Sequence, residues 1–141
     1  MFKAAFNAGR VRSMEQMVTN LTSHAEQVID ARAVERFEGR AVEPRPGLRA
    51  GHIPGARSLP YNRLFDAATG TMKSLPELRA AFSDAGVKLD APIVTSCGSG
   101  VSAAVLTLAL YRLGVENPAL YDGSWSEWGK ADGPPIATGY S

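Results

Sequence analysis

The sequence is poor in the residues that build disulfides and metal centres, with one cysteine and two histidines in 141 residues. A single cysteine excludes a disulfide within the chain. Cys97, His24 and His52 also lack the spacing of metal ligands. We therefore expect neither a bound metal nor a cofactor.

Net charge and long apolar runs are also scarce. The formal net charge is +1 and there is no basic block, so neither nucleic acid nor an anionic membrane is indicated as a partner. The longest apolar run is too short to span a bilayer, and residues 1–6 lack the apolar stretch of a secretory signal. With 45% hydrophobic and 21% charged residues, we expect a cytoplasmic globular protein with one core.

The single cysteine stands where a short strand is predicted to lead into a helix. Residues Ile93 to Ser96 follow Pro92 and favour β-structure, which predicts a buried strand. Residues 100–113 predict a helix, and because they carry no charge before Arg112, we expect most of its circumference to be buried. Cys97 begins the loop between the two elements.

This loop has the features of a reactive-cysteine site. In an α/β sheet, ligands bind where the carboxyl end of a strand leads into the amino end of a helix. Backbone N–H groups of residues 98–102 can converge there, and the helix dipole adds partial positive charge. We therefore expect Cys97 to react as a thiolate. The alternative is a buried structural cysteine, a common role of a lone cysteine.

The other patterns alternate between strands and helices. Further strands are predicted at residues 27–31, 56–59 and 119–121. Further helices are predicted after the capping boxes Ser13–Gln16 and Ser74–Glu77, and at residues 32–37 and 124–130. Residues 39–55, rich in proline, glycine and arginine, predict a long ordered loop. This alternation predicts an α/β fold, with a mostly parallel central sheet flanked by helices.

Three stretches carry a resemblance to a known family. They are Ala-Gly-His-Ile-Pro-Gly-Ala at 50–56, Cys-Gly-Ser-Gly-Val-Ser at 97–102, and Tyr-Asp-Gly-Ser-Trp-Ser-Glu-Trp at 121–128. From about Phe6 to Gly139 the chain resembles the rhodanese sulfurtransferases, which implies a rhodanese-like three-layer fold. The cysteine loop is similar to the Cys-Gly-Ser-Gly-Val-Thr form of 3-mercaptopyruvate sulfurtransferases. Thiosulfate-preferring members typically carry Arg and Lys where Gly98 and Ser99 stand.

The resemblance implies a reaction and a small-molecule sulfur donor. Cys97 would take sulfur from 3-mercaptopyruvate, leaving pyruvate and a Cys97 persulfide. The persulfide would pass its outer sulfur to cyanide or to a thiol acceptor such as thioredoxin or a low-molecular-weight thiol. The implied catalytic residues are Cys97 and Ser99. The implied substrate-binding residues are Arg36, Arg45, Gly98, Gly100, Val101 and Ser102.

The arginines are expected to bind the substrate carboxylate, because the loop side chains are neutral and a guanidinium binds a carboxylate through two hydrogen bonds. The alternative for each arginine is a surface position or an ion pair with Asp30 or Glu43. Ser99 either handles a proton or is a small residue that lets the loop amides point inward.

Other prominent residues of the motifs are expected to have structural roles. The family implies that His52 bonds the loop backbone, and we expect Arg32 to be structural as well. Trp125 and Trp128 are expected in the core.

One departure from the family concerns chain organisation. The mercaptopyruvate enzymes usually have two rhodanese domains, and this chain is similar to the second with its lead-in. We expect residues 1–22 to form the lead-in segment with an N-terminal helix, and residues 23–141 to form the sulfurtransferase domain. A preceding rhodanese domain, absent from this chain, is an expected partner.

Four other functions are alternatives to this one. A cysteine phosphatase needs an arginine six residues after the cysteine, where this chain has Ala103. Thiosulfate sulfurtransferase activity is a close alternative. A persulfide carrier fed by a partner desulfurase would share Cys97 without needing Arg36 and Arg45. A non-catalytic rhodanese-like module commonly lacks the cysteine.

Overall fold

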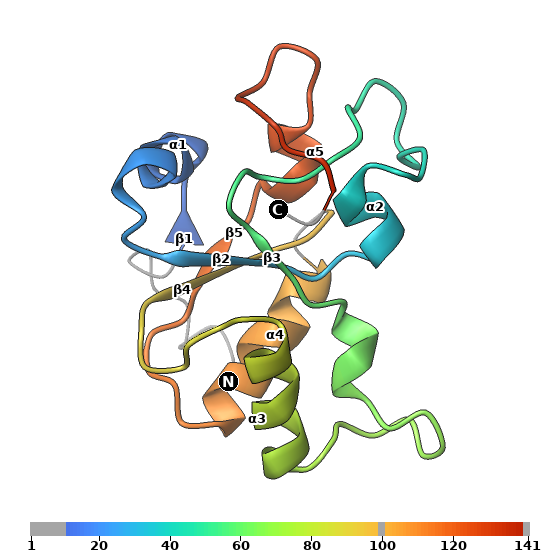
Figure 1. Ribbon diagram of the computed structural model, residues 1–141, viewed down its shortest axis with the longest axis vertical. Coiled ribbons are helices and arrows are strands. Elements are labelled where there is room, and N and C mark those ends of the chain that lie inside the picture. The colour runs from blue at the N-terminus through green and yellow to red at the C-terminus, as the bar shows by residue number, and fades with distance from the viewer. Residues whose placement is uncertain (1–10, 99–100, 140–141) are drawn as a thin grey trace, which may run out of the picture.

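The computed structural model describes residues 11–98 and 101–139 and contains a five-stranded parallel sheet (Figure 1). The strands lie in the order β1-β5-β4-β2-β3. Their bounds are β1 Val11–Arg12, β2 Gln27–Asp30, β3 Arg57–Ser58, β4 Ile93–Ser96 and β5 Ala119–Tyr121. Every pairing is parallel, so each connection has to cross over a face of the sheet before the chain returns.

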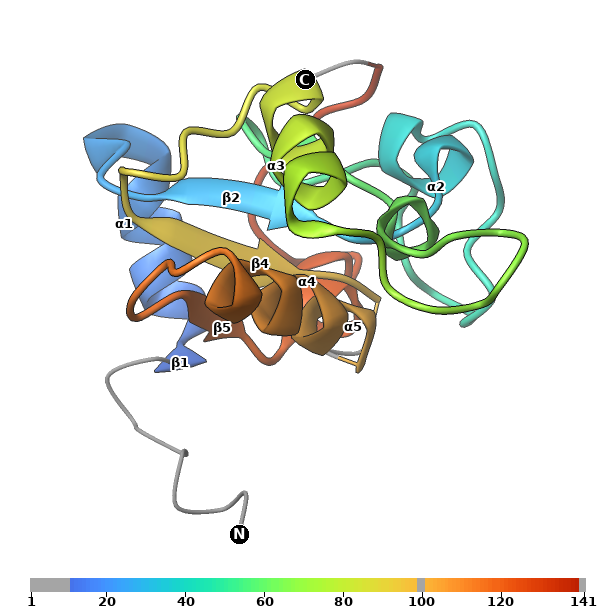
Figure 2. The same cartoon turned by 90° about the horizontal axis from the view of Figure 1, so that it is seen from below.

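Helices cover both faces and produce three layers (Figures 1 and 2). The helical segments are α1 Met14–Ser23, α2 Val34–Glu38, the 3₁₀ helix η3 Tyr61–Leu64, α3 Leu75–Asp84, α4 Val101–Arg112 and α5 Ser124–Trp128. One core cluster joins the sheet to α3, α4 and η3 through Phe82, Leu106 and Leu64. The other joins the sheet to α1, α2 and α5 through Met17, Phe37 and Trp128. The predicted three-layer α/β fold is confirmed.

Local sequence signals located most elements. Ser13 and Ser74 form the predicted capping boxes with Gln16 and Glu77, in which each serine hydroxyl accepts from the backbone N–H three residues on. The strand predicted at 93–96 is β4, and that predicted at 119–121 is β5. Two elements were missed, β1 and η3. β1 has two residues and is held by pairing with β5, a contact that no local pattern reveals.

The prediction that α4 is buried around most of its circumference is wrong. Ala103, Leu106 and Ala109 face the core, but Leu108 is 53% and Tyr111 41% exposed. The helix lies on one face of the sheet, so only the side toward β4 and α3 is covered within the described part of the chain. The absence of charge therefore did not indicate burial.

The long loop between α2 and β3 is ordered by the C-terminal tail. His52 and Ala137 exchange backbone hydrogen bonds of 2.9 Å in both directions. The Arg49 guanidinium donates to the carbonyl oxygens of Trp128 at 3.0 Å and Pro134 at 2.7 Å. Gly51 has a φ of +143°, and a Cβ there would lie 2.5 Å from the carbonyl oxygen of Ala137, so only glycine allows this approach.

Among the residues that the structure describes, no helix combines the length and apolar character needed to cross a bilayer.

The two sides of α4 provide a stability test. Leu106 is fully buried against the sheet, so Leu106→Ala should lower the free energy of unfolding by about 2–5 kcal/mol through lost burial and a residual cavity. Leu108→Ala, on the exposed side of the same helix, should change it by about 0.5 kcal/mol or less. Urea unfolding of both variants measures the difference. An equal cost at Leu108 would contradict the exposure of that face.

Candidate active site

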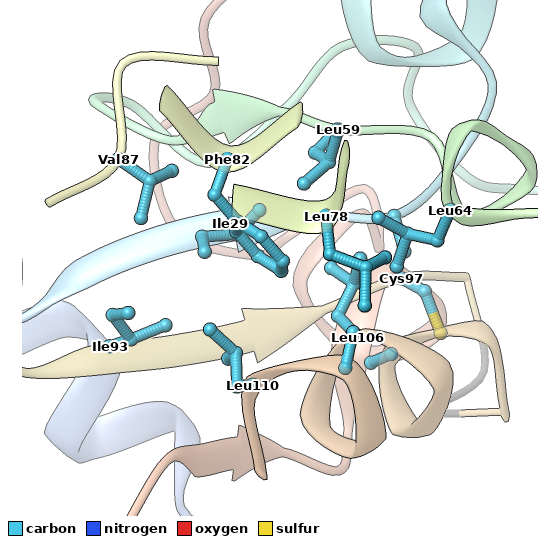
Figure 3. Packing of buried hydrophobic residues seen from close by; sticks show 13 residues of the cluster. Ile29, Leu59, Leu64, Leu78, Phe82, Val87, Ile93, Cys97, Leu106 and Leu110 are labelled. Atoms are coloured by element: carbon cyan, nitrogen blue, oxygen red, sulfur yellow. The ribbon is translucent and has the colours of Figure 1, made fainter. Parts of the chain in front are cut away.

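Cys97 lies directly after β4, at the edge of the sheet where the carboxyl ends of the parallel strands meet. Asp30 ends the neighbouring strand β2 on one side, and Tyr121 ends β5 on the other. Cys97 is 2% exposed. Figure 3 shows it at the margin of the α3–α4 core cluster, next to Leu106. The position is the ligand-binding edge of an α/β sheet.

The amino end of α5 holds the backbone of the cysteine loop. The N–H of Trp125 donates to the Cys97 carbonyl oxygen at 2.8 Å, and the N–H of Ser126 donates to the Gly98 carbonyl oxygen at 2.9 Å. Because the peptide unit is planar and trans, the N–H of Gly98 points away from the Cys97 carbonyl and hence away from α5. These two hydrogen bonds form a clamp on the cysteine loop. The clamp directs the Gly98 N–H toward the side of the loop opposite α5, as an anion site requires.

Ser124 adds a side-chain bond to the same clamp. Its hydroxyl accepts from the Cys97 N–H at 3.1 Å and donates to the Tyr121 carbonyl oxygen at 2.9 Å. The residue is fully buried and has a φ of +52°, in the left-handed region that non-glycine residues seldom adopt. Two hydrogen bonds thus hold a backbone conformation that is unfavourable for serine by itself.

The two tryptophans of α5 lie in the core, which confirms the expectation for them. The indole N–H of Trp125 donates to the Arg49 carbonyl oxygen at 2.8 Å, and that of Trp128 to the Pro135 carbonyl oxygen at 2.9 Å. The ring of Trp128 meets Tyr121 edge to face with centroids 6.2 Å apart. Both indole N–H groups therefore have an acceptor although the rings are buried.

Glu127 fixes the other polar group of this region. The Tyr121 hydroxyl donates to a Glu127 carboxylate oxygen at 2.6 Å. Burial, together with the hydrogen bond and charge of Glu127, raises the pKa of Tyr121 well above its ordinary value. The tyrosine therefore stays protonated and acts as a structural donor.

Arg36 of α2 lies against the cysteine loop. An added Cβ on Gly98 would lie only 3.0 Å from Nη2 of Arg36, so the guanidinium packs on the bare backbone at that position. Its Nε and Nη2 donate to the two carboxylate oxygens of Glu43, at 3.3 and 2.8 Å. The Arg36 side chain is 28% exposed. A cation thus stands beside the loop and remains accessible to solvent.

Arg32 has the structural position that was expected. Its guanidinium is buried and makes a bidentate ion pair with Asp30, with distances of 2.8–3.1 Å. It also donates to the Gly51 carbonyl oxygen at 2.7 Å and to Glu43 at 3.4 Å. The guanidinium carbon lies 4.5 Å from the centroid of the Trp125 ring.

Arg45 occupies a different environment from Arg36. It is exposed in the loop between α2 and β3, and its side chain has no hydrogen bond or ion pair with the rest of the described chain. The structure therefore places Arg45 on the surface, outside the Glu43 network.

The remaining predicted site residues are only partly described. Ser102 is half-buried in the first turn of α4, which begins at Val101. Ser99 and Gly100 lie outside the described residues, as does the side chain of Val101.

His52 is a buried structural residue. Its Nδ1 lies 2.7 Å from the Phe37 carbonyl oxygen, and because a carbonyl can only accept, Nδ1 carries the proton. The ring stacks on Phe37 with a centroid distance of 3.8 Å. Across the described chain, no group of three or more His, Cys, Asp and Glu side chains is arranged to hold a metal ion.

Comparison with known proteins identifies the family. A family model described as "Rhodanese-like domain" matches residues 13–131. The chain belongs to the rhodanese-like domain family.

The relatives of this rhodanese-like chain include sulfurtransferases. A 3-mercaptopyruvate sulfurtransferase of Escherichia coli K12 is 49% identical over 134 residues, covering 94% of this chain and 47% of that protein. Thiosulfate/3-mercaptopyruvate sulfurtransferase 2 of Arabidopsis thaliana is 44% identical over 135 residues, covering 96% and 39%. The crystal structure of the Tum1 protein from Saccharomyces cerevisiae superposes with a TM-score of 0.85 at 36% identity, covering 96% and 49%. The chain thus spans half or less of each protein.

Sequence reasoning missed two residues of this rhodanese-like site. The sequence indicates Glu43 only as an alternative ion-pair partner of the arginines, and Ser124 only as part of a family motif and as the first residue of a predicted helix. Glu43 is a single carboxylate in a proline-rich loop, and no spacing rule connects it with α2. The bond from the Ser124 hydroxyl to Cys97 joins residues 27 positions apart. Neither contact has a local signal.

The Ser124 hydroxyl can be tested directly. Ser124→Ala leaves the buried N–H of Cys97 without its acceptor and should lower the free energy of unfolding by about 1–3 kcal/mol. We also expect Cys97 to be alkylated faster by iodoacetamide, because the loop is then less firmly held. Ser126→Ala is the control, since its hydroxyl donates to the Gly123 carbonyl oxygen and does not touch Cys97. Alkylation at the wild-type rate in Ser124→Ala would contradict a role of the Ser124 hydroxyl in holding the cysteine loop.

Proposed function

We propose that this chain is a sulfurtransferase that takes sulfur from 3-mercaptopyruvate and passes it on through a persulfide of Cys97. The observation that carries the proposal is the pairing of a cysteine loop, held through its carbonyl oxygens by α5, with an accessible guanidinium packed on Gly98. The names and identities of the relatives from E. coli and A. thaliana support it.

The proposed reaction transfers one sulfur atom without an external oxidant. The Cys97 thiolate attacks the sulfur of 3-mercaptopyruvate, an S–S bond forms, and the C–S bond breaks. The electron pair of that bond leaves with carbon as the enolate of pyruvate, which takes up the thiol proton to become pyruvate. The two sulfur atoms are oxidised as the carbon is reduced. Cyanide or an acceptor thiolate then attacks the outer sulfur and releases the Cys97 thiolate.

The chain's own groups have distinct proposed roles. The N–H of Gly98, turned away from α5, and the backbone N–H groups of Val101 and Ser102 in the first turn of α4 stabilise the anionic sulfur in this proposal. Gly100 is proposed as a further binding residue of the same loop. Ser99 handles a proton of the substrate.

The substrate carboxylate is assigned to Arg36 and Arg45. Arg36 is held beside the cysteine loop, whereas Arg45 adds positive charge from an exposed side chain in the loop between α2 and β3. Because Glu43 already compensates part of the Arg36 charge, a second cation is expected in recognition of an anionic substrate.

The organisation of the working enzyme is part of the same proposal. Residues 1–22 form the lead-in with its helix, and residues 23–141 form the sulfurtransferase domain. A preceding rhodanese domain completes the site in a longer protein, as the partial coverage of the relatives suggests. The proposed acceptor is thioredoxin or a low-molecular-weight thiol, and the proposed location is the cytoplasm.

Thiosulfate is a second candidate donor. The A. thaliana relative is named for both thiosulfate and 3-mercaptopyruvate. Thiosulfate is also an anion that a guanidinium can bind. The amount of persulfide formed from each of the two donors therefore distinguishes the candidates.

Persulfide formation is the first test. After incubation with 3-mercaptopyruvate, intact-protein mass spectrometry should show the gain of one sulfur atom on the wild-type chain and none on Cys97→Ser. We expect less product with an equal concentration of thiosulfate, because the loop carries neutral residues where thiosulfate-preferring relatives carry cations. Greater loading by thiosulfate would favour the second candidate. Loading by neither donor, but by a cysteine desulfurase, would favour a persulfide carrier.

The arginines test the donor site. Arg36→Lys and Arg45→Ala should each raise KM for 3-mercaptopyruvate roughly tenfold to a hundredfold, the effect of losing a charged hydrogen bond. Transfer from a preformed persulfide to cyanide should stay at the wild-type rate, because that step involves no carboxylate. Arg40→Ala, which removes an exposed arginine paired with Glu38, is the control. An unchanged KM in both site variants would refute the carboxylate role.

A further inference from the structure

Glu43 is a buried carboxylate placed between two guanidinium groups. Its side chain is 1% exposed, although it belongs to a surface loop. One carboxylate oxygen lies 2.8 Å from Nη2 of Arg36, and the other lies 3.3 Å from Nε of Arg36 and 3.4 Å from Nη1 of Arg32. Each carboxylate oxygen therefore accepts at least one hydrogen bond from a guanidinium group, so neither buried oxygen is left without a donor.

The Arg32 side of this cluster is rigid. Arg32 is held by the bidentate pair with Asp30 at the end of β2 and by the Gly51 carbonyl oxygen. Asp30, Arg32 and Gly51 are all buried. Glu43 therefore connects a buried cation that makes several hydrogen bonds to one that is 28% exposed. An exposed arginine has several rotatable bonds, so a fixed partner determines where its guanidinium lies.

Glu43 also determines which donors of Arg36 remain for a ligand. A guanidinium has five N–H groups, and Glu43 takes the one on Nε and one on Nη2. The others are on Nη1 and Nη2, the two nitrogen atoms that lie nearest to the position of a Cβ on Gly98. The edge of the guanidinium that can bind a second carboxylate is thus turned to the cysteine loop.

We infer that Glu43 is a positioning residue for the sulfur-donor site, which holds the Nη1–Nη2 edge of Arg36 beside Gly98 so that it receives the substrate carboxylate. This inference rests on the proposed function. Glu43 itself does not touch the substrate.

Charge and geometry predict opposite effects when Glu43 is changed. The buried side chains of Asp30, Arg32 and Glu43 sum to one negative charge, which Arg36 balances. Removing the Glu43 charge leaves Arg36 a stronger cation and, by charge alone, would strengthen carboxylate binding. It also removes the hydrogen bonds that hold the guanidinium at the loop. Because the Arg36 side chain is partly exposed to solvent and its charge is screened there, we expect the loss of its position to outweigh the gain in charge.

Two substitutions separate these effects. In Glu43→Gln, one of the two oxygens becomes an NH₂ group that faces guanidinium donors, so the paired bonds to Arg36 are lost. In Glu43→Asp, the charge remains but the carboxylate is withdrawn by one methylene. Both variants should raise KM for 3-mercaptopyruvate about tenfold with little change in kcat. Arg32 keeps its pair with Asp30 in both, so the fold is retained, and the thermal unfolding midpoint checks this.

The position of Arg36 is measured independently of activity. In ¹⁵N NMR of the ligand-free wild-type chain, the Nε–H of Arg36 should give a resolved signal protected from solvent exchange. That signal should be lost in both Glu43 variants. Glu38→Gln, which changes a carboxylate of α2 paired with Arg40, is the matched control and should leave the signal and KM unchanged.

A double variant tests whether Glu43 acts through Arg36. If it does, adding Glu43→Gln to Arg36→Lys should raise KM no further. Additive effects, a lowered KM in Glu43→Gln, or wild-type behaviour of Glu43→Asp would overturn the inference. If the wild-type chain takes no sulfur from 3-mercaptopyruvate, the proposed function fails instead, and the Nε–H signal still decides whether Glu43 holds Arg36.

Discussion

A buried guanidinium connects the segments that form the candidate site. Arg32 pairs with Asp30 at the end of β2 and bonds both the Gly51 carbonyl oxygen and Glu43 in the following loop. It also lies over the ring of Trp125 in α5. A buried cation left with no compensating charge is strongly destabilising. The end of β2, the long loop and α5 are therefore held together by the need to keep one charge compensated.

Two separate devices prepare the region around Cys97. Backbone N–H groups of α5 bind the carbonyl oxygens of the loop, which turns the Gly98 N–H to the opposite side. Glu43 brings the Arg36 guanidinium to that loop from α2. In the proposed function, the first device provides neutral dipoles for an anionic sulfur, and the second provides a positioned cation for an anionic donor. Because Gly98 has no side chain, both act at the same short stretch of backbone.

The fold was predictable where short-range signals were strong. The capping boxes at Ser13 and Ser74 marked two helices, and the β-favouring run before Cys97 marked the central strand. β1 was missed because its two residues are a strand only through β5. The exposed side of α4 was missed because apolar composition does not say how many neighbours a helix has. Leu108 remains exposed although no residue of α4 before Arg112 is charged.

The residue pattern alone was enough to predict a cysteine loop at a strand end and the α/β fold that contains it. One cysteine between a β-pattern and a helix pattern, with glycine after it, is a local arrangement, and local arrangements are readable from neighbouring residues. Which charged groups lie next to one another is known only from the folded chain. Arg36 and Arg45 look equivalent as arginines near the same motif, but only Arg36 is held by a buried carboxylate. That difference arises because the loop folds Glu43 back onto α2, and such a contact depends on the packing of the whole domain.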